Sequence, residues 1–379
     1  MNDPRFIQNL HDLKPYFGSE KVSMQGALER HKSLLALVRM LSKEKNSPII
    51  KILEIGSWAG GSALTWAEGL KRYNRDKGRI LCVDPWRPYI DTDANPSQIY
   101  QTMTDGLNEG LIYQLFQHNV ESSGFGDLIS SCRGTSKDIL PLFQDASFDI
   151  VYIDGDHVFE QVGEDIQLAK RLVREGGILC GDDLELQMDE CDVEFATNQA
   201  KEKVDYVEDK KTGINFHPGV TLATWDEFGR VSAWNGFWAI RKTGDSWETF
   251  DLDHEKIELP QHLADAIEET NRTTPMAKIC GEMENYNLVH LGDRYIGIHQ
   301  KIGLIDLFDE PVGLRELSPI IFVANSMEDL QNKIAKNGIL SLEVNRELLS
   351  GIINKLPLSE ALSQFCKEII KKLLRKAGR

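Results

Sequence analysis

The sequence predicts an α/β protein with a Rossmann-like, mostly parallel sheet and a small C-terminal α+β accessory unit. Between residues 49 and 183, short apolar runs of strand length alternate with segments of helical periodicity. Strands and helices that alternate along a chain form right-handed βαβ crossovers. The strand-like runs are apolar throughout, which is typical of parallel strands that are covered by helices on both faces.

Five strands are expected in the first half of the chain, each a short apolar run that ends near a glycine or an aspartate. They cover residues 49–56, 79–85, 127–134, 148–155 and 176–183. Apolar residues recur at helical spacing over 24–42, and a helix is also expected between the last two strands, at 160–175. Residues 217–242 are interpreted as β-rich, with two segments that close the sheet antiparallel.

The pattern divides the chain into three parts. Residues 1–45 are an N-terminal helical segment, and 46–245 form the main domain, in which the charged stretch 184–216 is an insertion or lid. Residues 260–379 form the accessory unit, which contains two strands joined by a tight turn within 286–303. This unit ends in a basic amphipathic helix at 359–379. We expect this helix to dock on its own domain, and the alternative is peripheral contact with an anionic membrane.

Composition excludes several classes of function. Of 379 residues, 41% are hydrophobic and 27% charged, as in globular proteins. The net charge of −16 opposes binding to nucleic acid. No apolar run approaches the ~20 residues of a membrane span, and the N-terminus lacks the layout of a signal peptide. The six cysteines form no CxxC pair, so a reducing, cytoplasmic compartment is expected.

A glycine-rich segment follows the first strand. LEIGSWAGGS (53–62) places Glu54, Gly56 and Gly60 where a strand turns into a helix. Glycines allow a tight turn there and let backbone N–H groups approach a ligand at the helix N-terminus. Asp84 ends the second strand, where a carboxylate can accept hydrogen bonds from both ribose hydroxyls of a nucleoside cofactor. The alternative is a purely structural turn.

Two cofactors, NAD and S-adenosylmethionine, are candidates for the glycine-rich segment. A dinucleotide site usually has the spacing G-x-G-x-x-G, whereas this chain has G-S-W-A-G-G. Glu54 would repel a diphosphate, but it could bind the cationic amino-acid end of S-adenosylmethionine. The sequence therefore favours S-adenosylmethionine over NAD.

Four carboxylates follow two neighbouring strands. Asp154 and Asp156 end the fourth strand, and Asp182 and Asp183 end the fifth. Neighbouring strands lie ~4.8 Å apart, so these side chains converge at the carboxyl edge of the sheet, where such sheets bind ligands. Clustered carboxylates repel one another unless they are protonated or bridged by a cation, and oxygen ligands suit Mg²⁺ or Mn²⁺. The alternative is a set of solvated turns and helix caps.

These motifs allow a family to be named. Residues 49–183 resemble class I S-adenosylmethionine-dependent methyltransferases. More narrowly, they resemble the metal-dependent sugar O-methyltransferases of macrolide and aminocoumarin biosynthesis, which have cephalosporin-hydroxylase-like relatives. The resemblance is carried by LEIGSWAGGS, VDPW, the GTS of 134–136, YIDGDH and GDD. It implies a seven-stranded sheet in the order 3-2-1-4-5-7-6, with strand 7 antiparallel, and makes 46–245 the methyltransferase domain.

The resemblance also implies roles for individual residues. Around the amino-acid part of the cofactor it places the glycine-rich segment, with Glu54, Gly56, Ser57, Gly60 and Ser62. Asp84 would hold the ribose, and Ser136 and Trp86 would lie near the adenine. The metal ligands would be Asp154, Asp182 and Asp183. Asp156 would be the general base. His157 departs from the apolar residue that is more usual in the family at this position; a neutral imidazole there could share or replace the role of the base, or cap the next helix. Apart from the resemblance, His217 is expected to contact substrate or to be structural.

The resulting hypothesis is a cytoplasmic, metal-dependent S-adenosylmethionine O-methyltransferase that acts on a sugar hydroxyl of a glycan or a glycosylated metabolite. A homo-oligomer is expected, and no nucleic-acid partner. Two alternatives stay open. One is a hydroxylase-like enzyme on the same fold, and the other is a non-catalytic cofactor-binding subunit of a glycan-assembly complex.

Overall fold

The computed structural model describes residues 9, 12–17, 28–44, 49–93, 95–108, 110–271, 278–283, 286–291, 294–299, 321–324 and 326–338. The chain separates into two compact units. The larger is Asp12–Asn271, and the smaller combines Met1–His11 with Arg272–Arg379. The predicted domain boundaries at residues 45, 245 and 260 stay predictions.

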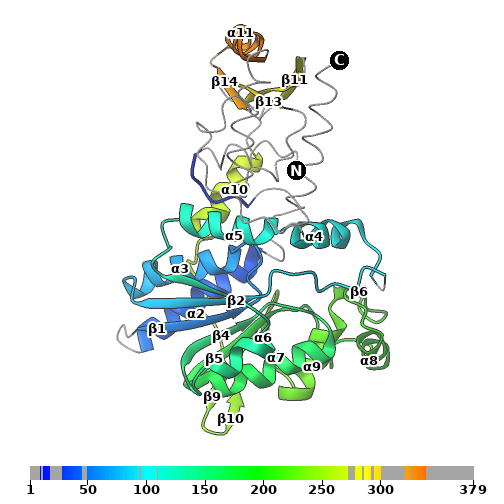
Figure 1. The fold of residues 1–379 in the computed structure, drawn as a ribbon. Helices are drawn as coiled ribbons and strands as arrows, with labels where there is room; N and C mark the ends of the chain where they lie inside the picture. Colours follow the sequence, from blue (N-terminus) through cyan, green and yellow to red (C-terminus); the bar gives the residue numbers. More distant parts are fainter. Residues whose placement is uncertain are drawn as a thin grey trace. The chain divides into compact units, whose positions relative to one another are not determined.

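The larger unit is built around one sheet (Figure 1). Its five parallel strands are β1 (Ile50–Ile55), β2 (Gly78–Asp84), β3 (Ile129–Arg133), β4 (Phe148–Ile153) and β5 (Val173–Leu184). The strand β9 (Gly236–Thr243) pairs antiparallel with β5, and two short strands pair antiparallel with β9. These two are β8 (Ser232–Trp234) and β10 (Ser246–Glu248).

The strand order confirms the expected fold class. It runs β10-β9-β5-β4-β1-β2-β3, with β8 also on β9. Because β8 is antiparallel to β9, it runs in the direction of the five parallel strands. The strand β9 therefore takes the place of strand 7 and β8 that of strand 6 in the order 3-2-1-4-5-7-6. The strand β10 extends the same edge.

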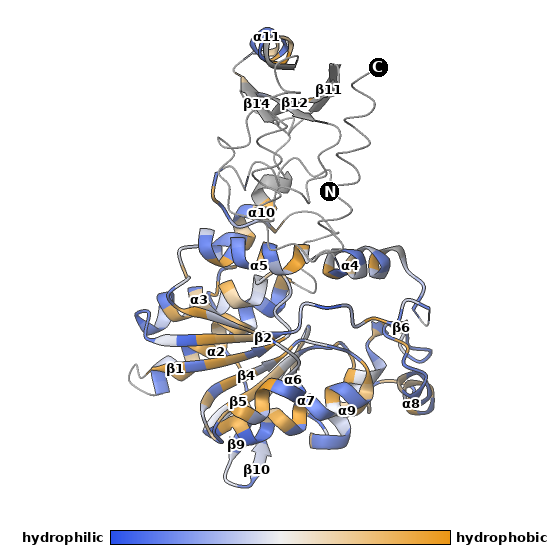
Figure 2. Cartoon of the chain, in the orientation of Figure 1, coloured by the Kyte–Doolittle hydropathy of each residue, from blue (hydrophilic) through white to orange (hydrophobic). Residues whose placement is uncertain are grey.

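Helices cover both faces of this sheet, as its apolar strands require. On one face, Val151 and Ile153 of β4 belong to a buried cluster with α7 (Phe159–Leu172) and α9 (Pro218–Phe228). On the other, Tyr152 packs edge-on against Trp66 of α3 (Gly61–Asn74). In Figure 2 the strands carry many hydrophobic residues, and the helices carry hydrophobic and hydrophilic residues together.

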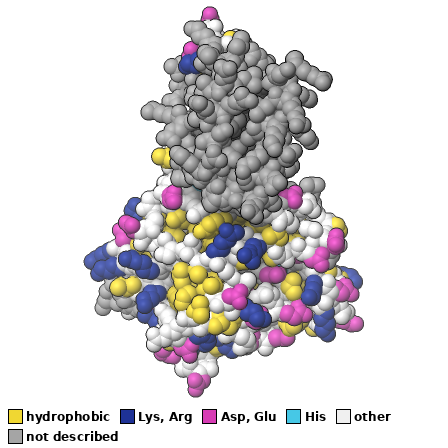
Figure 3. All heavy atoms as spheres, in the orientation of Figure 1, with side chains coloured by type: hydrophobic (Ala, Val, Ile, Leu, Met, Phe, Trp, Pro, Cys, Tyr) yellow, Lys and Arg dark blue, Asp and Glu magenta, His cyan; other side chains and the backbone are white. Residues whose placement is uncertain are grey.

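The remaining helices of the larger unit lie mostly in its connections. They are α2 (Leu28–Glu44), α4 (Gln98–Asn108), α5 (Leu111–Ser122), α6 (Ser136–Ile139), η1 (Leu140–Leu142), α8 (Val193–Lys201) and α10 (Gln261–Asn271). Helix α2 packs against α3, and matches the helix expected at 24–42. Lys and Arg side chains lie among Asp and Glu side chains on the face shown in Figure 3, so the charge on that face is mixed.

One connection differs from expectation. The β-rich interpretation of 217–242 is wrong for its first half, because Pro218–Phe228 is the helix α9. Proline is favoured in the first turn of a helix, where its missing N–H costs nothing. The expected insertion at 184–216 contains α8 and a small hairpin of β6 (Val207–Glu208) and β7 (Asn215–Phe216).

The smaller unit contains a four-stranded antiparallel sheet and one described helix. The elements are β11 (Lys278–Met283), β12 (Tyr286–Leu291), β13 (Arg294–His299), β14 (Ile321–Ala324) and α11 (Met327–Gly338). The expected pair of strands within 286–303 is confirmed as β12 and β13. The basic helix expected at 359–379 lies outside the described residues. Within the part of the chain that is described, no helix is long and apolar enough to cross a membrane.

Candidate active site

The carboxyl ends of the parallel strands open into a cavity of about 1210 Å³. Its lining includes the glycine-rich loop after β1, the ends of β2, β4 and β5, and residues of α2, α4 and α7. This is the edge at which open α/β sheets bind ligands. The cavity therefore lies where the sequence placed the site.

The loop after β1 is shaped by a glycine that no other residue can replace. Gly56 has φ +81°, and a Cβ on it would lie 1.9 Å from the carbonyl oxygen of Asp154. The backbone N–H groups of Ser57 and Trp58 donate to Asp84 Oδ2 at 2.9 and 3.1 Å. Gly60, with φ +89°, is the N-cap of α3. The close approach of β1 and β4 thus explains the glycine at position 56.

Asp84 and Trp86 stabilise this loop from β2. The second carboxylate oxygen of Asp84 accepts a hydrogen bond from the N–H of Trp86 at 2.5 Å. Burial raises the pKa of Asp84. Trp86 is itself buried, packs on Tyr113 and Phe116, and donates its indole N–H to the carbonyl of Trp58. Asp84 lines the cavity, whereas Trp86 packs behind it.

Ser136 lines the far part of the cavity with two residues of α7. Its hydroxyl donates to Asp165, to which Gln161 also donates at 3.1 Å. Burial raises the pKa of Asp165 to about 6. Sequence reasoning named Ser136 but missed Asp165 and Gln161, because helical periodicity alone does not show which polar residue of α7 turns toward the sheet edge.

Glu54 lies beneath the loop rather than on the cavity surface. Its side chain is fully buried and faces Cys82. Burial raises the pKa of Glu54 to about 8. At neutral pH this carboxyl group is therefore mostly protonated, and a protonated carboxyl group can donate a hydrogen bond.

Replacing Glu54 by glutamine is expected to reduce the dependence of stability on pH. Its pKa rises from 4.5 to about 8 on folding, so the folded state binds more protons between these values. The contribution of this carboxyl group to the free energy of unfolding is fully present below pH 4.5. It declines as the pH rises from 4.5 to about 8. Between pH 6 and 9, the wild type should lose more unfolding free energy than Glu54→Gln, by about 1 kcal/mol or more. Parallel curves in urea denaturation would contradict this.

Three carboxylates meet at the ends of β4 and β5. Oxygens of Asp154, Asp182 and Asp183 lie within 4.8 Å of one another. Consecutive strand residues normally point to opposite faces. Here the pairing of β5 with β9 is irregular between Gly181 and Leu184, and Asp183 has φ +64°. This bulge explains how two consecutive aspartates reach one site.

Arg30 joins this cluster from α2, and sequence reasoning missed it. Its guanidinium donates to Asp154 Oδ2 at 3.1 Å and forms an ion pair with Asp182. Only 5% of Arg30 is exposed. Asp154 Oδ2 also accepts a hydrogen bond from the hydroxyl of Tyr152 at 3.0 Å. No motif surrounds Arg30, since its role depends on how α2 packs.

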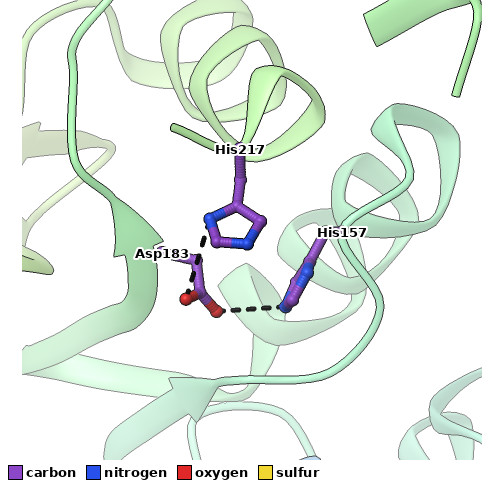
Figure 4. Close-up of side chains that lie close together, drawn as sticks. All are labelled: His157, Asp183 and His217. Carbon is purple, nitrogen blue, oxygen red and sulfur yellow. Dashed lines mark ion pairs between the residues drawn. The ribbon is translucent and has the colours of Figure 1, made fainter. Parts of the chain in front are cut away.

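His157 and His217 flank the other end of the cluster (Figure 4). His157 Nε2 lies 3.0 Å from Asp183 Oδ2, and its Nδ1 lies 2.8 Å from Asp205 Oδ1. Burial disfavours a charged ring, but Asp183 and Asp205 outweigh it and raise the pKa of His157 well above its usual range. His217 Nδ1 lies 3.0 Å from Glu185 Oε1 and 3.8 Å from Asp183 Oδ1. Both rings point toward Asp183.

Asp156 lines the cavity, but its side chain is hydrogen-bonded to the backbone of the turn that follows it. Its Oδ1 accepts a hydrogen bond from the N–H of Val158 at 2.9 Å, just before α7. Burial raises the pKa of Asp156. His157, its neighbour, has two carboxylate partners instead. Asp205 and Glu185 were not predicted, because both belong to the segment interpreted only as an insertion.

The donor set fits a hard divalent cation. Asp154, Asp182 and Asp183 offer oxygen atoms alone, at mutual separations that one ion can bridge. A second group of donors, His157, Asp183 and His217, offers two nitrogens and one oxygen. Arg30 already neutralises part of the first group. Both groups share Asp183.

Residues 53–184 match a family model described as a methyltransferase domain. The chain carries a methyltransferase domain. The match begins at β1 and ends at β5, and it includes the glycine-rich loop, Asp84 and the three clustered carboxylates. No curated protein matches the chain.

Solved structures to which the chain is similar include cofactor-bound Rv0187 from MTB, with 18% identity and a TM-score of 0.35; the match covers 63% of this chain and 89% of that one. An O-methyltransferase from Bacillus cereus, solved with SAH, has 20% identity and a TM-score of 0.35; the match covers 57% of this chain and 83% of that one. The O-methyltransferase TomG from Streptomyces achromogenes, solved with SAM, has 18% identity and a TM-score of 0.34; the match covers 62% of this chain and 98% of that one. Such values are too low to transfer a substrate to this methyltransferase domain.

Proposed function

We propose that the methyltransferase domain transfers a methyl group from S-adenosylmethionine to a sugar hydroxyl of a glycan or a glycosylated metabolite. The charge of the cavity carries this proposal. Of the described residues, eight carboxylates line the cavity, whereas only three Arg or Lys side chains do. The carboxylates are Asp84, Asp154, Asp156, Asp165, Asp182, Asp183, Glu185 and Asp205, and the basic residues are Arg30, Arg87 and Lys137. A negative field attracts a cationic sulfonium cofactor and opposes the diphosphate of NAD.

The cofactor would lie along the glycine-rich loop, where Gly56, Ser57 and Ser62 line the cavity. Asp84 accepts hydrogen bonds from three backbone N–H groups, which leaves about one of its four lone-pair sites for a ribose hydroxyl. Ser136 with Asp165 would face the adenine. S-adenosylmethionine would supply an electrophilic methyl group. Trp86 would contribute indirectly, by packing behind Trp58.

The rim of the cavity supports a sugar as acceptor. Tyr89 and Tyr206 line it and are partly exposed, at 38% and 49%. Aromatic rings present an apolar face beside a polar hydroxyl, which suits the mixed surface of a carbohydrate. Clustered carboxylates disfavour an acceptor that carries phosphate groups of its own.

His157 is the better supported of the two candidates for the general base. Asp205 accepts a hydrogen bond from its Nδ1 and fixes the ring, so Nε2 faces the acidic cluster. The raised pKa of His157 keeps the ring protonated at neutral pH. The ring can therefore accept the proton of a hydroxyl group only in its deprotonated form, and transfer should increase as the pH rises. Asp156 is committed to the N–H of Val158 through one oxygen, which supports a role in shaping the turn.

A divalent cation, Mg²⁺ or Mn²⁺, would be held by Asp154, Asp182 and Asp183. It would supply Lewis acidity, which lowers the pKa of a bound hydroxyl group. A cation on Asp183 would weaken the contact of this carboxylate with His157 Nε2, which would free that nitrogen to accept the proton of the activated hydroxyl.

Transfer of a labelled methyl group from S-adenosylmethionine to a panel of sugars tests this proposal. We expect transfer to stop in excess chelator and to return with Mg²⁺ or Mn²⁺. Asp182→Asn should resist that rescue, whereas Asp189→Asn, which changes an exposed ion pair with Arg230, should respond like the wild type. Undiminished transfer in excess chelator would mean that the carboxylates act without a cation.

Oxidation of the acceptor is a second candidate, and one observation favours it. His157, Asp183 and His217 form a set of two histidines and one carboxylate, which suits Fe²⁺ in oxygenases. The mass of the product separates the two reactions. A product heavier by one oxygen, formed with Fe²⁺, O₂ and a reducing co-substrate and without S-adenosylmethionine, would favour the second candidate.

A further inference from the structure

The acidic cluster already contains a cation that belongs to the chain. Arg30 contacts Asp154 and Asp182, which come from two different strands, and both Arg30 and Asp182 are only 5% exposed. Three carboxylates at this separation repel one another in a buried site. The planar guanidinium has donors for two carboxylates at once. Arg30 therefore stabilises the cluster by neutralising part of its charge.

A divalent cation would have to bind the carboxylate oxygens that Arg30 already contacts. The guanidinium contacts Asp154 Oδ2 and Asp182 Oδ2, and both aspartates belong to the three-carboxylate group. Asp183 is different, since its oxygens lie 3.0 Å from His157 Nε2 and 3.8 Å from His217 Nδ1. Two of the three carboxylates are thus engaged by Arg30, while the third faces the histidines.

We propose that Arg30 competes with the divalent cation for Asp154 and Asp182, and so sets the cation affinity of the site. This inference rests on the proposed function, because it takes these carboxylates as the cation's ligands. When the guanidinium contacts them, the cation binds only in the fraction of molecules in which Arg30 has moved away. Apparent affinity is reduced by that fraction. Arg30 is then a positioning residue that keeps the cluster assembled without a cation.

Titration with Mn²⁺ alone, followed by the electron paramagnetic resonance signal of the free ion, tests this competition. Arg30→Met keeps most of the side-chain length and removes the charge. We expect it to bind Mn²⁺ about tenfold more tightly than the wild type, or better. Arg39→Met is the matched control: Arg39 lies on the same helix but contacts the backbone carbonyls of Asp253 and Glu255 and the carboxylate of Asp253. Its Mn²⁺ affinity should equal that of the wild type.

Equal or weaker Mn²⁺ binding by Arg30→Met, or no binding by either protein, would overturn the role of Arg30. A crystal structure of the wild type with Mn²⁺ gives a second test, in case Arg30→Met fails to fold. The guanidinium should leave Asp182 when Mn²⁺ is bound, and an ion on the carboxylates with Arg30 still in contact would also overturn the proposal. Titration of the same samples with S-adenosylmethionine reports on the proposed function separately.

Discussion

Replacing His157 by glutamine is expected to lower kcat by about 10²–10⁴, the usual contribution of a general base. The ring lies between Asp205 and Asp183, so the substitution removes the proposed base from the acidic cluster. The glycine-rich loop does not depend on His157, and the affinity for S-adenosylmethionine should persist. Single-turnover methyl transfer and calorimetric titration of the cofactor would measure the two effects separately.

Asp156→Asn is the matched control for this variant. An asparagine side chain still offers an oxygen to the N–H of Val158, so the turn before α7 should keep its shape. We expect kcat to fall much less than in His157→Gln. The opposite pattern, with Asp156→Asn nearly inactive and His157→Gln active, would exchange the two roles. Full activity in both would mean that neither side chain removes the proton.

Replacing Gly56 by alanine is expected to abolish cofactor binding and to destabilise the larger unit. The new Cβ would lie 1.9 Å from the carbonyl oxygen of Asp154, at a φ of +81°. Either β1 and β4 separate at the site, or the loop moves. Overpacking typically costs 1–3 kcal/mol, and left-handed backbone adds about 1 kcal/mol or more. Thermal denaturation should therefore show a large fall in Tm.

Gly124→Ala separates the two causes of this effect. Gly124 has a similar φ of +76°, but a Cβ there would have no atom within 4 Å. This variant should lose only the conformational part, about 1 kcal/mol, and bind the cofactor normally. If Gly56→Ala were no less stable than Gly124→Ala, the close approach of β1 and β4 would not explain the glycine.

Much of the fold was predictable because the alternation of strands and helices follows from local patterns, whereas the strand order came from the resemblance to class I methyltransferases. The apolar run 148–155 and the glycine-rich segment 53–62 each mark the end of a strand. Because strands that are joined by βαβ crossovers are parallel, both ends lie at the same edge of the sheet. Helix α9 was missed because β-branched and aromatic residues near Trp225 favour strands. Pro218, at the first turn of that helix, was the available signal for a helix.

The site was predictable where its residues follow strands and unpredictable where packing supplies them. Asp154 and Asp182 could be named from the sequence because they end neighbouring strands. Arg30 and Asp205 could not, since one comes from the packing of α2 and the other from the segment after α8. The bulge at Asp183 is also a tertiary feature, because it arises in the pairing of β5 with β9.

Calorimetric titration of the wild-type protein with S-adenosylmethionine, and separately with NAD, tests the central claim most directly. It needs neither the acceptor nor the cation. The acidic cavity and the loop held by Asp84 predict one site for S-adenosylmethionine and no heat of binding for NAD. Asp84→Ala should weaken binding of S-adenosylmethionine by about 1–3 kcal/mol, through lost hydrogen bonds to the ribose and the loop. Binding of NAD with no response to S-adenosylmethionine would contradict the account.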